Sequence, residues 1–419
     1  MAATRMMSFC RTVAVFGALA VAAAPASAQD RLIERNRWLG AHGQFGQDLG
    51  PAPDIADVSF FGGDEYGVKD GVAYHLLTGA AGHLGAGRPV AFDGARPRVF
   101  MLRADGIWQA VVKPIAPGAL AVSASLYSGG PTSDLRECRH AASADVLVCA
   151  AERSDGAYDL VRLDPAGRHL LFTDNVSVNP GGWWSLVLTP DAARIYYLRC
   201  LTPGCSTRDV ALFDVVTGAI SNAGIPDFVH LFAGGGVLTW DEVNERLFVE
   251  AGGSFAVLAR DLAPVGRASI GGRCRNLAIS PHTGRLYVNK MDYYYSPEWS
   301  TLSAFDAATY RALEPEAIRS AGFSCGPLKV LTAPGKPRAL RATVTGGTVS
   351  LTWTNVGNAS HFVVEAGLAP GRTDLRIGLG ADAHATFTGV PAGTYYLRIR
   401  GGNVHGGGHA SDEIRVVVP

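Results

Sequence analysis

The sequence has no excess of charge of either sign. Its 419 residues contain 37 Lys and Arg residues against 37 Asp and Glu residues, and charged residues make up only 18% of the chain. This balance argues against a broad basic face for nucleic acid and against an acidic tail. The 51 glycines and 47% apolar residues indicate many tight turns between buried strands instead.

Long apolar runs are also scarce, and the one near the N-terminus predicts a secretion signal. Arg5 and Arg11 accompany an alanine-rich apolar run over 13–24, and an Ala-Ser-Ala sequence then matches the small-x-small cleavage pattern. The alternative is an uncleaved membrane anchor, but the run is shorter than the roughly 20 strongly apolar residues that a span needs. We expect residues 1–28 to be removed, so that a secreted or periplasmic protein without a membrane span begins at Gln29. Cleavage leaves 35 positive and 37 negative residues.

Motifs of familiar catalytic sites are missing as well. The sequence contains no H-E-x-x-H, no G-x-S-x-G and no G-x-x-x-x-G-K-[ST]. The glycine-rich segment 79–88 resembles a phosphate-binding loop only superficially, because it lacks the lysine and the hydroxyl residue, and we interpret it as a connection. His405 and His409 are four residues apart, but they are predicted on a surface loop rather than on a helix face. We expect no cofactor and no metal ion.

Cysteine is infrequent, but its arrangement is informative. Six of the seven cysteines remain after the signal is removed, an even number in a compartment that permits disulfides. Cys200 and Cys205 flank a Leu-Thr-Pro-Gly turn, and Cys138 and Cys149 are symmetric about a point where a hairpin would place them opposite one another. A metal site is disfavoured because no Cys-x-x-Cys pair is present. The predicted disulfides are Cys138–Cys149, Cys200–Cys205 and Cys274–Cys325.

A short phrase recurs through the middle of the chain. It consists of arginine, an apolar residue, an aromatic residue and another apolar or aromatic residue, and turn residues stand on both sides of it. Asp-Gly or Gly-Gly follows several copies, which suits hairpin turns with positive φ. Copies spaced by roughly 40–50 residues are typical of four-stranded propeller blades. The copies begin at Arg98, Asp145 (without the arginine), Arg194, Arg246 and Arg285, and a degenerate copy occupies residues 65–68.

These phrases resemble the blades of bacterial β-propellers of the YVTN and lactonase-like type. The resemblance covers roughly residues 50–331 and implies an all-β ring. Six blades are counted, and a seventh exists if residues 326–333 return to close the ring. Residues 29–49 are then expected to form an N-terminal segment. Relatives of this type bind a metal or use acidic pocket residues, but no such set is matched in this sequence.

The chain changes character at residues 332–336, a short linker in which Pro334 precedes Gly and Lys and Pro337 follows them, and strict strand alternation comes next. Residues 337–419 resemble a fibronectin type III domain, a β-sandwich. The tryptophan of the family's second strand matches Trp353, and the aromatic residue of its third strand matches Phe362. The Pro-x-Gly-Thr-Tyr phrase matches residues 391–395. Further matches are Pro337, Leu340 and the Asn-x-x-Gly at 403–406.

Aromatic residues gather in two connections that should otherwise be polar. Flat aromatic side chains on loops suit sugar rings or extended peptides, and packing between blades is the alternative. In a meandering blade, the entry connection and the second hairpin emerge on one face, so both connections and the turn at 200–205 should share one mouth of the ring. The candidate ligand-binding residues are Tyr293, Tyr294, Tyr295, Trp299, Trp183 and Trp184.

Two functions compete on this basis. We expect a monomeric, non-enzymatic binding protein whose propeller face takes an extracellular glycan or protein, with the fibronectin-like module as a spacer or docking unit. The alternative is a lactonase-like hydrolase or a polysaccharide lyase with its site in the channel of the ring. Acidic residues, histidine or arginine converging in the channel would favour the enzyme, and an apolar channel would favour binding.

Overall fold

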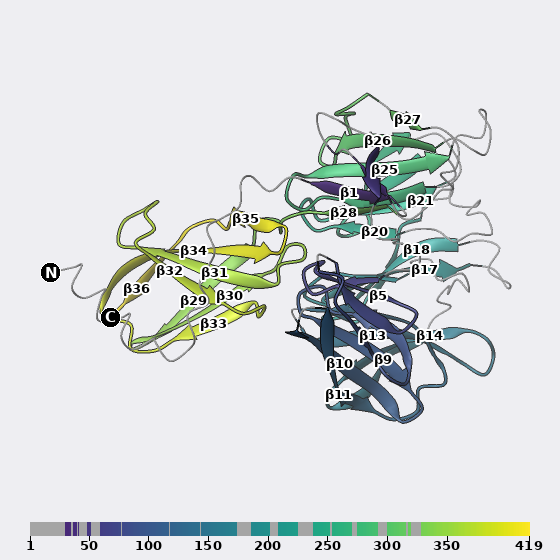
Figure 1. Cartoon of the computed structure of the whole chain (residues 1–419), viewed down its shortest axis with the longest axis horizontal. Helices are drawn as coiled ribbons and strands as arrows, with labels where there is room; N and C mark the ends of the chain where they lie inside the picture. The colour runs from purple at the N-terminus through teal and green to yellow at the C-terminus, as the bar shows by residue number, and fades with distance from the viewer. Residues whose placement is uncertain are drawn as a thin grey trace.

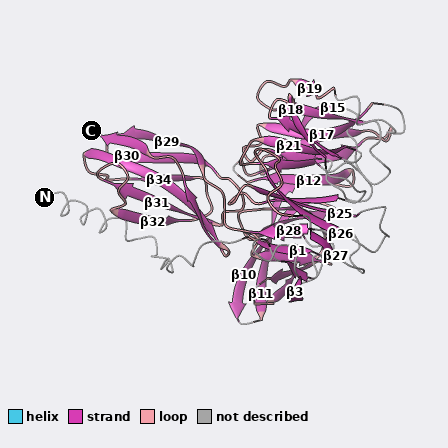
Figure 2. Ribbon diagram, turned by 90° about the horizontal axis from the view of Figure 1, so that it is seen from above, coloured by secondary structure: helices cyan, strands magenta, loops and turns pink. Residues whose placement is uncertain are grey.

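The structure is a computed structural model and contains strands but no helix within the residues that it describes. It describes residues 30–419 except 35–36, 40, 42–47, 52–58, 77, 117, 143, 174–185, 202–207, 225–237, 252–253, 270–274, 292–299, 316 and 320–327. Figure 2 shows a larger and a smaller body, both made of strands and loops. In this part of the chain no helix could cross a membrane. The expected all-β class is confirmed.

Strands β1 to β28 form a ring of four-stranded antiparallel blades. Five sheets contain four strands, and one contains eight because two blades join at a single parallel bridge between Ala81 and Ala119. The first strands of successive blades, for example β8, β12 and β16, contact one another around the axis. This arrangement is a β-propeller, and the described strands make seven blades.

Blade 1 consists of β28, β1, β2 and β3, and blades 2 to 7 follow in chain order. The ring strands are β1 (Arg31–Glu34), β2 (Arg37–Leu39), β3 (Asp48–Pro51), β4 (Ser59–Phe61), β5 (Tyr66–Lys69), β6 (Val72–His75), β7 (Ala81–His83), β8 (Arg88–Phe92), β9 (Arg98–Arg103), β10 (Gly106–Ala116), β11 (Ala119–Gly129), β12 (Leu135–Ala141), β13 (Val146–Glu152), β14 (Tyr158–Asp164), β15 (Gly167–Thr173), β16 (Leu186–Leu188), β17 (Arg194–Cys200), β18 (Arg208–Asp214), β19 (Ile220–Asn222), β20 (Leu238–Asp241), β21 (Arg246–Ala251), β22 (Ser254–Ala259), β23 (Pro264–Ser269), β24 (Arg275–Ile279), β25 (Arg285–Met291), β26 (Ser300–Asp306), β27 (Ala317–Arg319) and β28 (Leu328–Leu331).

The two ends of the ring sequence share blade 1, which corrects the expected organisation. Strand β28 pairs antiparallel with β1, with Leu32 opposite Val330. Figure 1 shows β1, in purple, among the green strands β25 and β28. Residues 29–49 are therefore not a separate N-terminal segment, because residues 31–51 supply three strands of a blade. The alternative of seven blades is confirmed, because β28, within the segment 326–333, returns to pair with β1 and closes the ring.

The recurring phrase opens the second strand of its blade, and its aromatic residue packs between blades. Phe100, Tyr196, Phe248 and Tyr287 occupy the same position in four copies, and each is fully buried. Phe100, for example, belongs to a cluster with Leu147 of the next blade. The phrase therefore recurs because neighbouring blades need a large buried side chain to pack between them.

The arginine that begins the phrase reaches toward the following blade. Arg194 donates a hydrogen bond to the carbonyl oxygen of Arg260 at 2.8 Å, and Arg246 donates to the carbonyl oxygen of Ala308 at 2.7 Å. Arg98 forms an ion pair with Asp145 of the next blade. The arginines of blades 5 and 6 reach the turn between the third and fourth strands of the next blade, and Arg98 reaches the turn between the first and second strands of blade 4.

One of the three predicted disulfides falls within the described residues, and it is confirmed. Cys138 and Cys149 face each other across the hairpin β12–β13 and form a disulfide. Both side chains are buried in the cluster between blades 3 and 4. Cys205, Cys274 and Cys325 lie outside the described residues, as does the side chain of Cys200, so the other two pairs stay predictions.

The C-terminal residues form a β-sandwich with its own core. One sheet has the order β29-β30-β33, and the other has the order β32-β31-β34-β35, with β36 also paired to β34. Trp353 and Phe362 meet edge to face at 5.2 Å inside it. The hydroxyl of Tyr395 donates to the carbonyl oxygen of Pro391 at 2.9 Å, an arrangement found in immunoglobulin-like sandwiches. The strands are β29 (Arg338–Thr345), β30 (Thr348–Thr354), β31 (His361–Gly367), β32 (Leu375–Leu379), β33 (His384–Phe387), β34 (Gly393–Asn403), β35 (Gly406–Ala410) and β36 (Ile414–Val418).

Candidate ligand-binding face

The sandwich covers one face of the ring. The Gly357 amide donates to Glu242 of blade 6, and the Asn358 amide group donates to Asp64 of blade 2. Those blades are three apart in a ring of seven, so the loop 355–360 lies across the ring axis. The expected linker, residues 332–336, is buried apart from its last residue, so it does not act as an extended spacer.

Within the described residues, the ring contacts of the sandwich come from the turns between first and second strands or from the end of β28. Figure 1 shows the sandwich on one side of the ring. The starts of the first strands, such as β8 and β12, and the ends of the second strands point to the opposite face, which we call the open face. The contacts are Arg96–Asp382 (2.5 Å), Asn403–Thr332 (2.9 Å), His405–Asp64 (3.3 Å), Arg338–Glu245 (3.7 Å) and the stacked rings of His282 and His409 (4.5 Å).

The predicted aromatic residues lie outside the described residues. Strand β25 ends at Met291 and β26 begins at Ser300, on either side of Tyr293, Tyr294, Tyr295 and Trp299. Strand β16 begins at Leu186, directly after the segment with Trp183 and Trp184. These strand ends belong to the open face, as the expected shared mouth requires. Ligand binding by the six aromatic residues stays a prediction.

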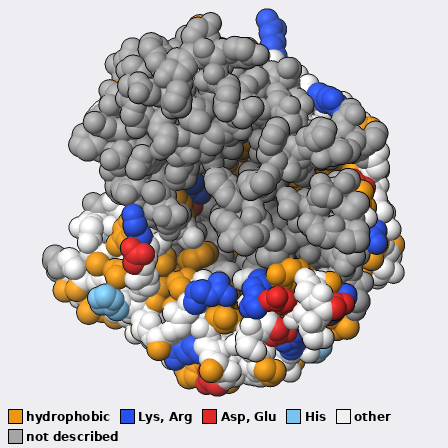
Figure 3. Space-filling view, turned by 90° about the vertical axis from the view of Figure 1, so that its right-hand side faces the viewer, with side chains coloured by type: hydrophobic (Ala, Val, Ile, Leu, Met, Phe, Trp, Pro, Cys, Tyr) orange, Lys and Arg blue, Asp and Glu red, His pale blue; other side chains and the backbone are white. Residues whose placement is uncertain are grey.

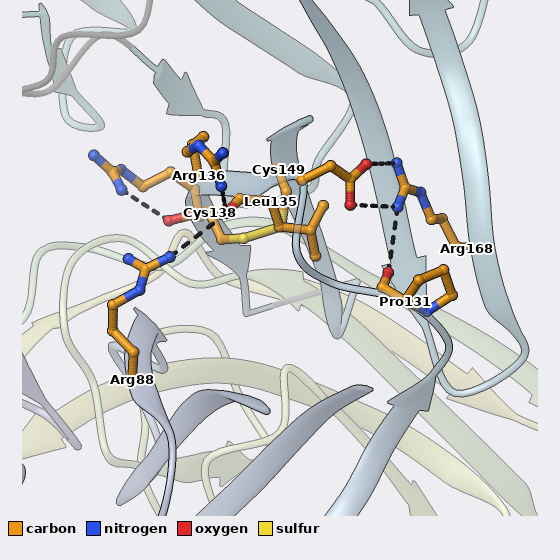
Figure 4. Close-up of a disulfide and its surroundings, with 9 residues drawn as sticks. Arg88, Pro131, Leu135, Arg136, Cys138, Cys149 and Arg168 are labelled. Atoms are coloured by element: carbon orange, nitrogen blue, oxygen red, sulfur yellow. Dashed lines mark hydrogen bonds and ion pairs between the residues drawn. A yellow bond between two sulfur atoms is a disulfide. The ribbon is translucent and has the colours of Figure 1, made fainter. Parts of the chain in front are cut away.

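Two arginines converge at the channel end of the open face. Arg88 opens β8, and Arg136 is the second residue of β12, the first strand of the next blade. Both guanidinium groups point to the carbonyl oxygen of Leu135, at 3.5 and 3.3 Å, as Figure 4 shows. Partial burial and the charge of Arg136 lower the pKa of Arg88. Two positive charges therefore lie close together where an anion would relieve their repulsion.

The carboxylates near this pair are already engaged. Glu152, at the end of β13, forms an ion pair with Arg136. Asp134 pairs with Arg168 at 2.5 Å, and this pair lowers the pKa of Asp134. Among the described ion pairs, no carboxylate partners Arg88. The local balance therefore leaves one uncompensated positive charge at the mouth.

An open cavity of about 540 Å³ is lined by the connections that lead to Arg88 and Arg136, but by neither of these arginines. Its lining includes Gly87, Leu102, Arg103 and Thr132, from the entry connections of blades 3 and 4 and the end of β9. The Arg103 guanidinium donates to the carbonyl oxygen of Ala86 at 2.9 Å. It also lies 4.3 Å from the ring centre of Trp108, so its orientation is fixed from two sides. Figure 3 shows basic, acidic and apolar side chains together on the described part of this face.

A group with metal-ligating residues lies at the covered face but does not fit a metal ion. Asp93, His140 and Asp145 have ligand atoms within 4.8 Å of one another. Both Nε and Nη2 of Arg98 already donate to Asp93, at 3.1 and 2.7 Å, and Arg98 also pairs with Asp145. Hydrogen bonding to His140 and to Arg98 lowers the pKa of Asp145. The guanidinium of Arg98 therefore supplies the positive charge that a metal ion would otherwise bring, and the group is an ion-pair network.

The structure changes the interpretation of one sequence feature and adds another. His405 and His409 do not lie on a free loop, because His405 contacts Asp64 and His409 stacks on His282. The convergence of Arg88 and Arg136 was not predicted. The sequence signal for it was an arginine at or near the start of the first strand in each of two successive blades. The sequence alone does not show that these two strands are neighbours in the ring.

Comparisons with known proteins give distant likenesses. No protein-family model matches this sequence, and no curated protein matches it. An Fn3-like protein from Clostridium thermocellum is 25% identical over 21% of this chain and 95% of its own, with a TM-score of 0.20. A putative 6-phosphogluconolactonase from Bacteroides fragilis is 12% identical over 74% of this chain and 99% of its own, with a TM-score of 0.45. The chain spans 17% of a structure of titin kinase and its flanking domains, at 22% identity and a TM-score of 0.19.

Proposed function

We propose that this is an exported binding protein whose open propeller face takes an acidic carbohydrate chain. The observation that carries the proposal is the convergence of Arg88 and Arg136 on one carbonyl oxygen, where Glu152 forms an ion pair with Arg136 alone. A carboxylate or sulfate on the ligand would neutralise the remaining charge through hydrogen bonds from guanidinium groups. The adjacent cavity gives room for the sugar that carries this group.

Carbohydrate is preferred to other anions because of the aromatic residues predicted for the same face. Sugar rings pack on flat aromatic side chains at low entropic cost. Tyr294 and Trp299 are the expected partners in one connection, and Trp183 in the other. The arginines would then recognise the acidic group, and the aromatic residues would contribute contact area.

The C-terminal sandwich, which we infer to be of the fibronectin type III kind, acts in this proposal as a docking unit for the ring. Its loop 355–360 lies over the ring axis at the covered face and contacts Glu242 and Asp64. The ligand would therefore approach the channel from the open face. This role differs from that of a flexible spacer, because the linker itself is buried.

The enzyme alternative has one observation in its favour, since arginine converges at the channel mouth. Lactone hydrolysis or chain cleavage also needs a general base. The described acids near the arginines, Glu152 and Asp134, are held in ion pairs with Arg136 and Arg168. Binding is therefore the function that the described geometry supports better.

The proposal is tested by binding of the mature protein to an array of acidic and neutral polysaccharides. We expect binding to uronic acid or sulfated chains that weakens as salt rises, because exposed charges are screened. The double substitution Arg88→Gln and Arg136→Gln should weaken binding by roughly tenfold to a hundredfold, as expected for loss of charge-assisted hydrogen bonds.

Arg153→Gln is the matched control. Arg153 belongs to the second hairpin of blade 4, and Asp155 and Asp159 neutralise it at 2.8 and 3.1 Å. Its loss should change affinity less than twofold. Equal binding to neutral chains, or binding unaffected by the double substitution, contradicts the proposal. Release of shortened chains or hydrolysed lactone during the assay would establish the enzyme instead.

A further inference from the structure

The outward face of the larger sheet of the sandwich carries a group of arginines. Alternate residues of β31, β34 and β36 face the core, among them Val364, Leu397 and Val416. Their neighbours in sequence therefore face outward. On β31, β32, β34 and β36 the charged outward residues are four arginines and one glutamate: Arg376, Arg398, Arg400, Arg415 and Glu365.

Strand register places Arg376, Glu365 and Arg398 in one row, and Arg415 continues this row with a displacement of two residues. Glu365 of β31 lies opposite Arg376 of β32 on one side and opposite Arg398 of β34 on the other. Arg415 of β36 lies opposite Tyr396, the next outward residue along β34. Neighbouring strands are about 4.8 Å apart, so the row crosses four strands over roughly 14 Å. Positive charge is thus arranged along a line rather than scattered.

Glu365 holds the arginines in place without neutralising them. It is only 3% exposed, and its carboxylate lies 3.3 Å from Arg376, 3.5 Å from Arg398 and 3.2 Å from Arg400. One negative charge therefore serves three guanidinium groups, and Arg415 adds a fourth positive charge in an exposed position. Guanidinium groups fixed in this way lose little freedom when they bind an anion.

We propose that this row is a second binding surface, which takes a linear acidic polysaccharide through Arg376, Arg398 and Arg415. Charge complementarity along a line fits a chain with repeated carboxylate or sulfate groups. An anionic membrane fits less well, because membrane-binding surfaces combine basic residues with inserted apolar side chains. On these four strands the large exposed apolar side chain is Val417. The surface is distinct from the open face of the ring, and the inference does not depend on the function proposed there.

The test uses the full-length mature protein, with dextran sulfate as the probe and unsulfated dextran of equal length as the uncharged match. Arg376→Gln combined with Arg415→Gln should weaken binding of dextran sulfate at least fivefold and make it less sensitive to salt. Thermal stability should change little, because Arg398 and Arg400 still pair with Glu365. Binding to unsulfated dextran should be absent in both proteins.

Arg372→Gln provides the matched control. The Arg372 side chain is 69% exposed, close to the 67% of Arg376, but Asp374 neutralises it at 2.9 Å. The control should bind within twofold of the parent protein. The proposal is overturned if control and double variant lose affinity equally, if neither does, or if anionic lipid vesicles bind in place of dextran sulfate. It is also overturned if Arg88→Gln with Arg136→Gln abolishes all binding, because the ring would then be the sole site.

Discussion

Asp30 shows how a single residue can hold the ring closed. Its side chain is buried, and its two carboxylate oxygens accept hydrogen bonds from four hydroxyl groups at 2.7–2.8 Å. Three donors, Ser280, Thr283 and Tyr287, belong to blade 7, and the fourth, Thr332, follows β28. Asp30 directly precedes β1, so it ties the start of the ring sequence to its end.

Replacement of Asp30 should therefore be costly. Asp30→Ala leaves several buried hydroxyl groups without an acceptor, so we expect it to lower the free energy of unfolding by at least about 3 kcal/mol. Asp30→Asn keeps the shape and one acceptor oxygen and should cost less. Equilibrium unfolding in urea measures both. A loss below about 1 kcal/mol for the alanine variant would show that closure does not depend on this carboxylate.

Glu242 is a second residue whose environment leads to a prediction. It accepts the Gly357 amide where the sandwich meets the ring, and burial together with the charge of Asp241 raises its pKa to about 7. A raised carboxyl pKa means that its contribution to stability is complete below pH about 4.5 and falls as pH rises toward 7. Glu242→Gln should therefore raise the melting temperature at pH 8 but not at pH 4. A gain of the same size at both pH values would contradict this linkage.

The hairpin β12–β13 is the element that the disulfide stabilises. Cys138 and Cys149 close a loop with a sequence separation of 11, which is worth up to about 3 kcal/mol in the chain-entropy model. Replacement of both by alanine should lower stability by that amount or less, and reductant should destabilise the parent protein but not the variant at this site. Equal unfolding curves for the parent and variant would contradict the prediction. Peptide mapping without reduction would test the other two predicted pairs.

The whole molecule has an interface that should respond to acid. Burial lowers the pKa of His282, His361 and His405, which lie at or near the contact between the sandwich and the ring. A lowered histidine pKa means that the contact between the sandwich and the ring favours the neutral imidazole. The contribution of each histidine to the stability of this contact is therefore lost as pH falls through about 6.5. Glu242 acts in the opposite direction, so it offsets part of the effect of the histidines.

We therefore expect the sandwich to separate from the ring between pH about 6.5 and 5. Small-angle X-ray scattering should show a larger radius of gyration at pH 5 than at pH 7.5. His282→Gln together with His405→Gln should reduce the difference, because neither glutamine can take up a proton. An unchanged radius in the parent protein across this range would rule out the acid response.

By itself the sequence determined the strand units, because an arginine, a buried aromatic residue and a hairpin turn are local requirements that recur in each blade. It determined the hairpin disulfide for the same reason, since Cys138 and Cys149 are close along the chain. The sandwich core was also local, with Trp353 and Phe362 on predicted strands. A seventh copy of the phrase, Arg31 to Glu34, was present but lacks the aromatic residue that marks four of the other copies.

Only the tertiary structure decided what depends on contacts between distant segments. Ring closure pairs β1 with β28, nearly 300 residues apart, and no local pattern specifies that partner. The docking of the sandwich depends on turns from several blades meeting one surface. The meeting of Arg88 and Arg136 at Leu135 depends on two blades standing side by side. These features arise from the geometry of a closed ring, which sets distances between residues that the order of the sequence leaves open.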